Sequence, residues 1–231
     1  MIWFYLDGKD SREHGVYLRR VPEIMSAEPD IEFVHIPGRA GTLTQDFGGF
    51  LDVGTVLECY IKDVANIGEA YGFMSGYHEL VISEDMTRKY RATFYGSAQA
   101  ERVVRNMKAW EMSIPVKLKP FRYFVDVDDV EIAASGSAVI NPGSAPAEPR
   151  ITITGNGDMT VMIGMYIMEF EGVVNGLIVD CDKKQILTHD GTARYLDQDI
   201  DEFPMLMPGA NYIQWTGDVS AMTIEPRWRD R

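Results

Sequence analysis

The stretch Ile31-Glu32-Phe33-Val34-His35-Ile36-Pro37-Gly38-Arg39-Ala40-Gly41-Thr42-Leu43 organises the first part of the chain. Its opening residues are rich in β-formers and alternate in polarity, which predicts a strand over 31–36. Pro37 and Gly38 then break the strand, because proline has no N–H to donate and glycine tolerates positive φ. The local interpretation is a hairpin corner that carries Arg39 into solvent. The alternative is that the turn belongs to an arm that docks on another surface.

The size and composition of the chain are those of a folded globular protein. Its 231 residues are 45% hydrophobic and 25% charged, which fits one large domain or two of ordinary size. Cys59 and Cys181 lie far apart, so we expect neither a disulfide scaffold nor a C-x-x-C site, and assembly in a reducing compartment fits. The apolar run over 2–6 is too short for a signal peptide, and no run has the length of a membrane span. We therefore expect a protein that is not exported by that route and does not cross a membrane.

Charge is distributed unevenly along the chain. The net charge of −13 argues against a nucleic-acid-binding surface on the monomer as a whole. Residues 1–125 hold 15 Lys and Arg against 17 Asp and Glu, whereas residues 126–231 hold 7 against 18. The asymmetry predicts two domains with different surroundings, and the acidic run 126–129 is the expected linker. We place the domains at 1–128 and 129–231.

The first domain is expected to be mainly β with one helix. A helix is expected from Asp63 to Gly76, and residues 46–50 are expected to be a flexible link because of Gly48 and Gly49. Residues 110–118 alternate with period two around Pro115, which predicts an edge strand or a bulge there. The other expected strands are 2–6, 15–18, 31–36, 56–62, 80–82 and 90–95.

The second domain has a different pattern, of short apolar runs separated by turns. The sequences Asn141-Pro142-Gly143, Gly155-Asn156-Gly157 and Asn175-Gly176 separate runs that show no helical periodicity. Closely spaced strands of this kind predict an antiparallel β-sandwich. The fold class expected for the whole chain is therefore mainly β.

Candidate chemical sites are few. His14, His35, His78 and His189 are not at metal-ligand spacing, so each is expected to be a core or surface histidine. Acidic pairs, Asp180 with Asp182 and the run 197–202, leave a metal-dependent hydrolase as one alternative. Trp215 and Trp228, with Tyr212, leave a sugar-binding aromatic platform as another. We expect no catalytic residues, no metal and no cofactor, and hence no enzyme.

The order of several turn motifs along the chain resembles the distal tail protein family of long-tailed, siphovirus-like bacteriophages. The stretch 36–43 is similar to that family's "(V/I)PGRxGxL" turn, although Ala40 stands where the family often has an acidic residue. Gly8, Ser11 and Gly15-Val16 resemble its opening hairpin, and Pro120-Phe121-Arg122-Tyr123 the end of its first domain. Two further motifs are similar to those of its second domain: Ile140-Asn141-Pro142-Gly143-Ser144 with Pro149, and Phe203-Pro204-Met205-Leu206-Met207-Pro208-Gly209-Ala210-Asn211.

The resemblance implies a virion structural protein of the tail tip, or baseplate hub. Its first domain would form a hexameric belt, and its second would be a galectin-like antiparallel β-sandwich that projects outward. The ring would join the tail tube protein and the end of the tape measure protein to fibre or receptor-binding components. DNA could pass through the lumen without specific binding. The protein would assemble in the host cytoplasm, and this chain is too short to contain an inserted sugar-binding module.

A closed ring needs two different surfaces on each subunit, because its contacts are heterologous. The candidates are the arm over 31–43 and the expected edge over 110–118, since unpaired strand edges accept partners. The subunit-interface residues expected in the arm are Ile36, Pro37, Gly38, Arg39, Gly41 and Leu43. We expect Arg39 to bind a carbonyl or carboxylate of the neighbouring subunit. The main alternative to this reading is a carbohydrate-binding adhesin of the tail tip.

Overall fold

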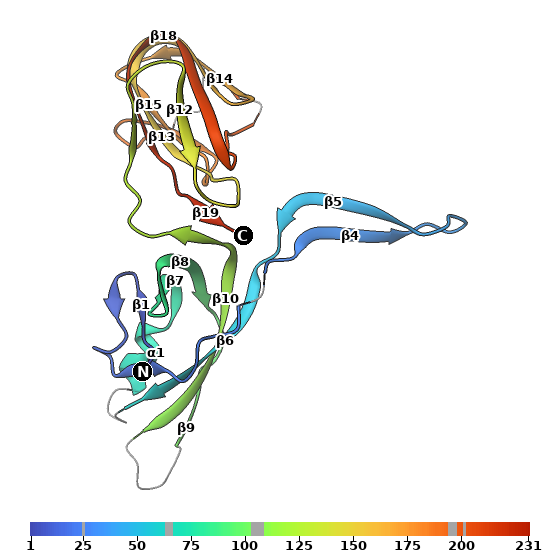
Figure 1. Ribbon diagram of the computed structural model, residues 1–231, viewed down its shortest axis with the longest axis vertical. Coiled ribbons are helices and arrows are strands. Elements are labelled where there is room, and N and C mark those ends of the chain that lie inside the picture. Colours follow the sequence, from blue (N-terminus) through green and yellow to red (C-terminus); the bar gives the residue numbers. More distant parts are fainter. Residues whose placement is uncertain (25, 63–66, 103–108, 194–197, 201) are drawn as a thin grey trace. The chain divides into compact units, whose positions relative to one another are not determined.

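The computed structural model describes residues 1–24, 26–62, 67–102, 109–193, 198–200 and 202–231 (Figure 1). These residues are mainly β, and they form two compact units. The first unit is Met1–Val125 with Arg231, and the second is Asp126–Asp230. The division falls close to the linker expected at 126–129. Each unit is described separately below.

The first unit is built on an antiparallel sheet with the strand order β2-β1-β7-β8-β10-β6-β3, and β9 also pairs with β10. Side chains of alternating positions on one face of this sheet form the core, in which Phe4, Leu57 and Val116 are fully buried. The strands are β1 (Phe4–Leu6), β2 (Lys9–Asp10), β3 (Val16–Leu18), β6 (Val53–Ile61), β7 (Gly76–Ile82), β8 (Asp85–Phe94), β9 (Gln99–Arg102) and β10 (Trp110–Phe124).

The helix α1 (Ile67–Phe73) is shorter than the sequence pattern predicts. Ala70 and the following Met74 are buried in the core, so packing stabilises this short helix in spite of its glycines. Gly76, with φ of 95°, ends the segment and begins β7. The expected cap, Asp63, lies outside the described residues. Within the described residues, no helix is long and apolar enough to cross a membrane.

Residues 110–118, expected to be an edge strand or to hold a bulge at Pro115, are central in the sheet, and the register irregularity of β10 lies between Leu118 and Arg122. β10 pairs with β6 along one side from Trp110 to Leu118. On its other side it pairs with β9 up to Ser113 and with β8 from Val116 onward. Pro115 lies in the interval between these two partners, where its missing N–H interrupts neither ladder. This strand therefore does not offer the exposed edge that we expected.

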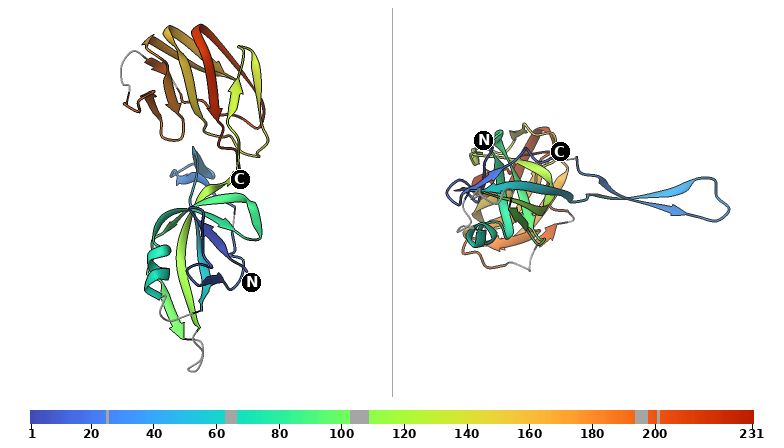
Figure 2. Two further views of the ribbon diagram at one scale, coloured as in Figure 1. Left: turned by 90° about the vertical axis from the view of Figure 1, so that its left-hand side faces the viewer. Right: turned by 90° about the horizontal axis from the view of Figure 1, so that it is seen from below.

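Strands β4 (Pro29–His35) and β5 (Thr42–Phe50) form a separate two-stranded sheet. They form a hairpin that extends away from the other strands of the first unit (Figures 1 and 2). We call residues 29–50 the arm.

The second unit is one curled antiparallel sheet of eight strands with the core order β11-β18-β13-β14-β17. Strand β12 also pairs with β18, β15 pairs with β13, and β16 pairs with β15. The strands are β11 (Val130–Ile132), β12 (Ser137–Asn141), β13 (Arg150–Ile163), β14 (Tyr166–Val173), β15 (Leu177–Asp180), β16 (Gln185–Thr188), β17 (Gln198–Ile200) and β18 (Gly209–Glu225). A further short strand, β19 (Arg229–Asp230), follows β18.

Two long strands replace four of the short strands that the sequence predicts. Gly155-Asn156-Gly157, expected to be a turn, lies inside β13, where the register against β18 shifts twice. A Cβ on Gly155 would lie 2.1 Å from the carbonyl oxygen of Asp218, so this position requires glycine. The glycines therefore serve β-bulges that bend a continuous strand. The bends let the two ends of β13 pair with different strands, β15 and β14.

A buried ion pair joins β15 to the segment after β18. Arg227 Nη1 lies 2.8 Å from Asp180 Oδ1, and Arg227 Nε lies 3.0 Å from Glu225 Oε1. The Asp180 side chain is 4% exposed. Burial alone would raise the pKa of Asp180, but the hydrogen bonds and charge of Arg227 lower it below the ordinary value of 3.8.

Arg227→Met should destabilise the second unit by about 3 kcal/mol at neutral pH, because it leaves the Asp180 charge buried and unpaired. The double variant Asp180→Asn/Arg227→Met should lose less than the sum of the single variants. Urea unfolding followed by tryptophan fluorescence measures these differences.

The pH dependence of the same pair has a definite sign. Since the folded-state pKa of Asp180 is lowered, the pair stabilises fully above the unfolded value near 3.8 and loses this contribution as pH falls through the folded value. The stability difference between wild type and Arg227→Met should therefore shrink below pH 3.8. A difference that stays constant from pH 7 to pH 3 would contradict this assignment.

Candidate functional site

The candidate site is the tip of the arm. Val34 pairs with Leu43 and His35 with Thr42, and residues 36–41 turn the chain between the strands. Gly38 and Gly41 have φ of 83° and 78°, values that L side chains rarely adopt. Every residue from 35 to 48 is exposed.

The six residues expected at a subunit interface all lie at this tip. The structure brings Ile36, Pro37, Gly38, Arg39, Gly41 and Leu43 together within the turn and its first cross-strand pairs. The Arg39 N–H donates to the carbonyl of Ile36 at 3.1 Å, which closes the turn and leaves the guanidinium in solvent. Whether these residues contact another subunit stays a prediction.

The expected flexible link over 46–50 is wrong, because β5 continues through Phe50. Gly48 has φ of 73°, and its N–H donates to Asp46 Oδ1 at 2.8 Å. The glycines therefore bend the strand without ending it. Residues 43–47 hold three consecutive polar residues between Leu43 and Phe47, so strict alternation did not signal the longer strand.

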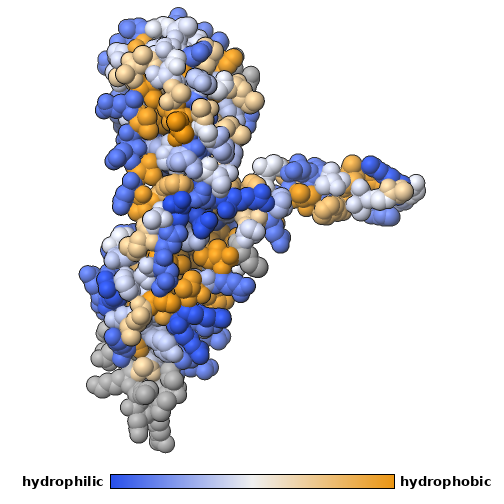
Figure 3. Space-filling model, viewed as in Figure 1, coloured by the Kyte–Doolittle hydropathy of each residue, from blue (hydrophilic) through white to orange (hydrophobic). Residues whose placement is uncertain are grey.

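The two faces of the arm differ in polarity. Glu32 and Gln45 form a cross-strand pair on one face of the arm, and by strand alternation this face also carries Val34 and Ile36 of the first limb with Leu43 and Phe47 of the second. Ile36, Leu43 and Phe47 are 38%, 40% and 54% exposed. We call Val34, Ile36, Leu43 and Phe47 the apolar arm face, and hydrophobic atoms are visible along the arm in Figure 3. The opposite face carries Ile31 and Phe33 with His35, Thr42, Thr44 and Asp46.

An isolated hairpin of two strands is at best marginally stable in water. Contacts at the base hold this one. The Leu51 N–H donates to the Glu28 carbonyl at 2.8 Å, and the Phe50 ring contacts Phe121 edge-on at 5.5 Å. Beyond the base, residues 35–48 are exposed, so the rest of the first unit covers neither face of the outer arm.

The tryptophans proposed as a sugar platform do not form one. Trp228 is 6% exposed, so its ring has no open face for stacking. Trp215 is half-buried on β18, where its backbone N–H donates to Ser135 Oγ at 2.9 Å. Tyr212 is exposed, but the buried Trp228 cannot join it in a platform that stacks on a sugar. The aromatic residues of this unit serve mainly as packing.

One acidic pair and the two cysteines have structural surroundings. Asp180 and Asp182 face Arg227, and part of the run 197–202 lies outside the described residues. Burial raises the pKa of the Cys59 and Cys181 thiols to about 12. Among the described residues, no group of three or more His, Cys, Asp or Glu side chains could hold a metal ion.

Three of the four histidines contact a neighbouring carboxylate or carbonyl, and the fourth is exposed. His14 and His78 each lie within 3 Å of a carboxylate, on Glu69 and Asp7 respectively. His189 Nε2 lies 3.1 Å from the Ile153 carbonyl oxygen, and His35 is exposed on the arm.

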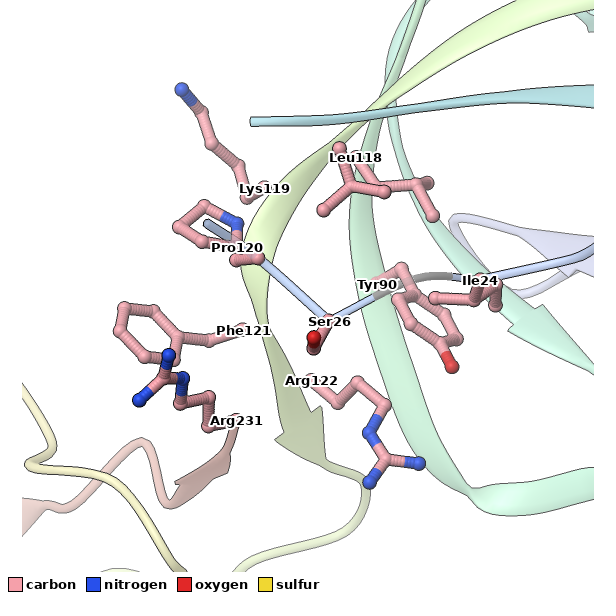
Figure 4. Close-up of a pocket in the computed structure, with 11 residues that line it drawn as sticks. Ile24, Ser26, Tyr90, Leu118, Lys119, Pro120, Phe121, Arg122 and Arg231 are labelled. Atoms are coloured by element: carbon pink, nitrogen blue, oxygen red, sulfur yellow. The ribbon is translucent and has the colours of Figure 1, made fainter. Parts of the chain in front are cut away.

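A pocket of about 240 Å³ in the first unit lies where β8 and β10 meet the segment before the arm (Figure 4). Ile24, Tyr90, Leu118 and Arg122 are among its lining residues. Burial raises the pKa of Tyr90 even though Arg122 acts to lower it, so the phenol stays protonated. None of the described residues that line the pocket is His, Cys, Asp or Glu. It therefore offers no pair of carboxylates and no imidazole for acid–base chemistry.

Comparison with known proteins finds the likeness in structure and not in sequence. No protein-family model matches the chain, and no curated protein matches it. Among solved structures, the chain is similar to the Dit protein (gp 19.1) of phage SPP1, described as a paradigm of the hub adsorption apparatus in phages that infect Gram-positive bacteria. The TM-score is 0.70 at 13% identity, over 97% of this chain and 98% of that chain. This chain therefore has the Dit fold along nearly its whole length.

Proposed function

We propose that this protein is a non-enzymatic structural component of a phage tail tip, in which it forms a ring at the distal end of the tail tube. The observation that carries the proposal is the likeness to SPP1 Dit, which covers almost all of both chains. The turn motifs in the same order along the sequence support it. The proposal places the protein in the virion after assembly in the host cytoplasm.

The proposed ring is a hexamer of first units. It joins the tail tube protein and the tape measure end on one side to fibre or receptor-binding components on the other. The second unit, proposed to be galectin-like, projects from the ring. The exposed arm supports the ring, because a heterologous interface needs a surface on one copy that fits a different surface on the next.

The apolar arm face is the proposed adhesive surface between subunits. Burying a leucine or phenylalanine side chain contributes about 1.5–3 kcal/mol. Leu43 and Phe47 lie on this face, and the rest of the first unit leaves both exposed. Docking on a neighbour would remove them from water and would supply the stability that a free hairpin lacks.

Shortening the arm should abolish the ring without unfolding the monomer. Ile31 pairs with Asp46, so residues 32–45 can be replaced by Asn-Gly, a two-residue hairpin turn. The wild-type chain should form six-subunit rings, alone or with tail-tip partners, and the shortened chain should stay monomeric with the same circular dichroism and Tm. Light scattering and negative-stain images report the two states. Rings from the shortened chain, or monomers of the wild type even with its partners, would refute the proposal.

The faces of the arm should differ in their effect on assembly. Leu43→Asn/Phe47→Asn should raise the concentration needed for half-assembly at least about 100-fold, since it removes two buried apolar side chains. Phe33→Asn, on the opposite face, is the matched control and should have a smaller effect. Concentration-dependent light scattering measures the shift. Equal shifts for the two faces would mean that the apolar arm face is not the contact.

A further inference from the structure

A groove lies at the base of the arm. Its volume is about 510 Å³, and it is lined by Ser26, Glu28, Leu51, Asp52, Val53 and Gly54. The hydrogen bond from the Leu51 N–H to the Glu28 carbonyl fixes the two sides of the base relative to each other. Leu51 is 48% exposed, so the groove combines an open apolar side chain with two carboxylates. It is large enough to accept a side chain from outside.

The tip of the same arm carries a single positive charge. Arg39 is the only charged residue from 36 to 45. Within the part of the chain that the structure describes, Arg39 has no carboxylate partner and Glu28 has no cationic partner. Asp52 lies 3.4 Å from Lys119 Nζ and 3.9 Å from Lys117 Nζ. A carboxylate has about four acceptor sites, so these lysines leave Asp52 able to accept a further donor.

The length of the arm is close to the width of one subunit. Ile36 lies eight residue positions after Glu28, which at a rise of about 3.4 Å per residue gives about 27 Å, and the turn with the Arg39 side chain extends this reach. The rest of the first unit, roughly 100 residues, has an expected radius of gyration of about 13 Å and so a width of about 33 Å. An arm that leaves one copy can therefore reach the corresponding base on the next.

We propose that the Arg39 tip of each arm binds in the groove at the base of the next subunit's arm, with the guanidinium between Glu28 and Asp52. This inference rests on the proposed function, because it names the receiving surface of the ring. A planar guanidinium suits carboxylate oxygens with its paired N–H groups. Ile36 and Leu43 of the incoming tip would cover Leu51. The contact is tip to base, so it repeats from copy to copy and closes a ring.

A charge exchange tests this pair. Arg39→Glu and Glu28→Arg should each reduce assembly at least tenfold in half-assembly concentration, because each places like charges together. Arg39→Glu/Glu28→Arg restores the opposite charges and should recover most of the wild-type assembly. The control is Arg39→Glu/Glu13→Arg, which has the same net charge but places the new arginine on an exposed turn away from the groove. The control should assemble no better than Arg39→Glu alone.

The measurement is light scattering over a range of concentrations, with circular dichroism and Tm confirming that every variant folds as the wild type does. Normal rings from Arg39→Glu, or failure of the exchange variant while both single variants are impaired, would overturn the tip-to-base pairing. Rings from the arm-shortened chain would instead refute the proposed use of the arm. Failure of the tip-to-base pairing can thus be distinguished from failure of the proposed role of the arm in the ring.

Discussion

The structure depends on a constraint of β-sheets: a two-stranded ribbon cannot bury both faces by itself. The main sheet of the first unit has its own core and is complete without β4 and β5. The arm therefore contributes its residues 35–48 to no core within its own subunit. Its apolar residues Ile36, Leu43 and Phe47 are left exposed by the rest of the first unit. The proposed contact with a neighbouring copy would cover them.

The sequence predicted the tip of the arm well and its extent poorly. Pro37, Gly38 and Gly41 determine a turn by local chemistry alone, so the six tip residues could be found from spacing. Gly48 and Gly49 have the same local signature, yet they lie within β5. In the second unit Gly155 behaves likewise, as a bulge in β13. Glycine reports that the backbone departs from regular geometry, but only the cross-strand partner determines whether the strand ends there or bends.

The groove and the centre of the first sheet show a second limit of sequence reasoning. Pro115 suggested an edge strand or a bulge. In the structure it lies where one neighbour of β10, β9, ends and the next, β8, begins, and nothing in the local sequence signals this change of partner. The groove is formed where Glu28 meets Leu51 and Asp52, across the whole length of the arm. No spacing rule brings those positions together. Trp228 is likewise buried, although its own segment gave no sign of this.

The charge distribution fits the proposed roles of the two units, in which the first forms the ring and the second projects from it. The ring proposal brings identical first units side by side, and like charges on identical surfaces repel. The first 125 residues carry a net charge of −2, against −11 for the remainder of the chain. Self-repulsion is therefore small in the unit that must associate, and the excess acid lies in the unit that need not. In the proposed contact, the Arg39 cation of one copy meets the Glu28 carboxylate of the next, whereas contact between two tips would bring two cations together. Such polarity favours a head-to-tail ring over a symmetric dimer.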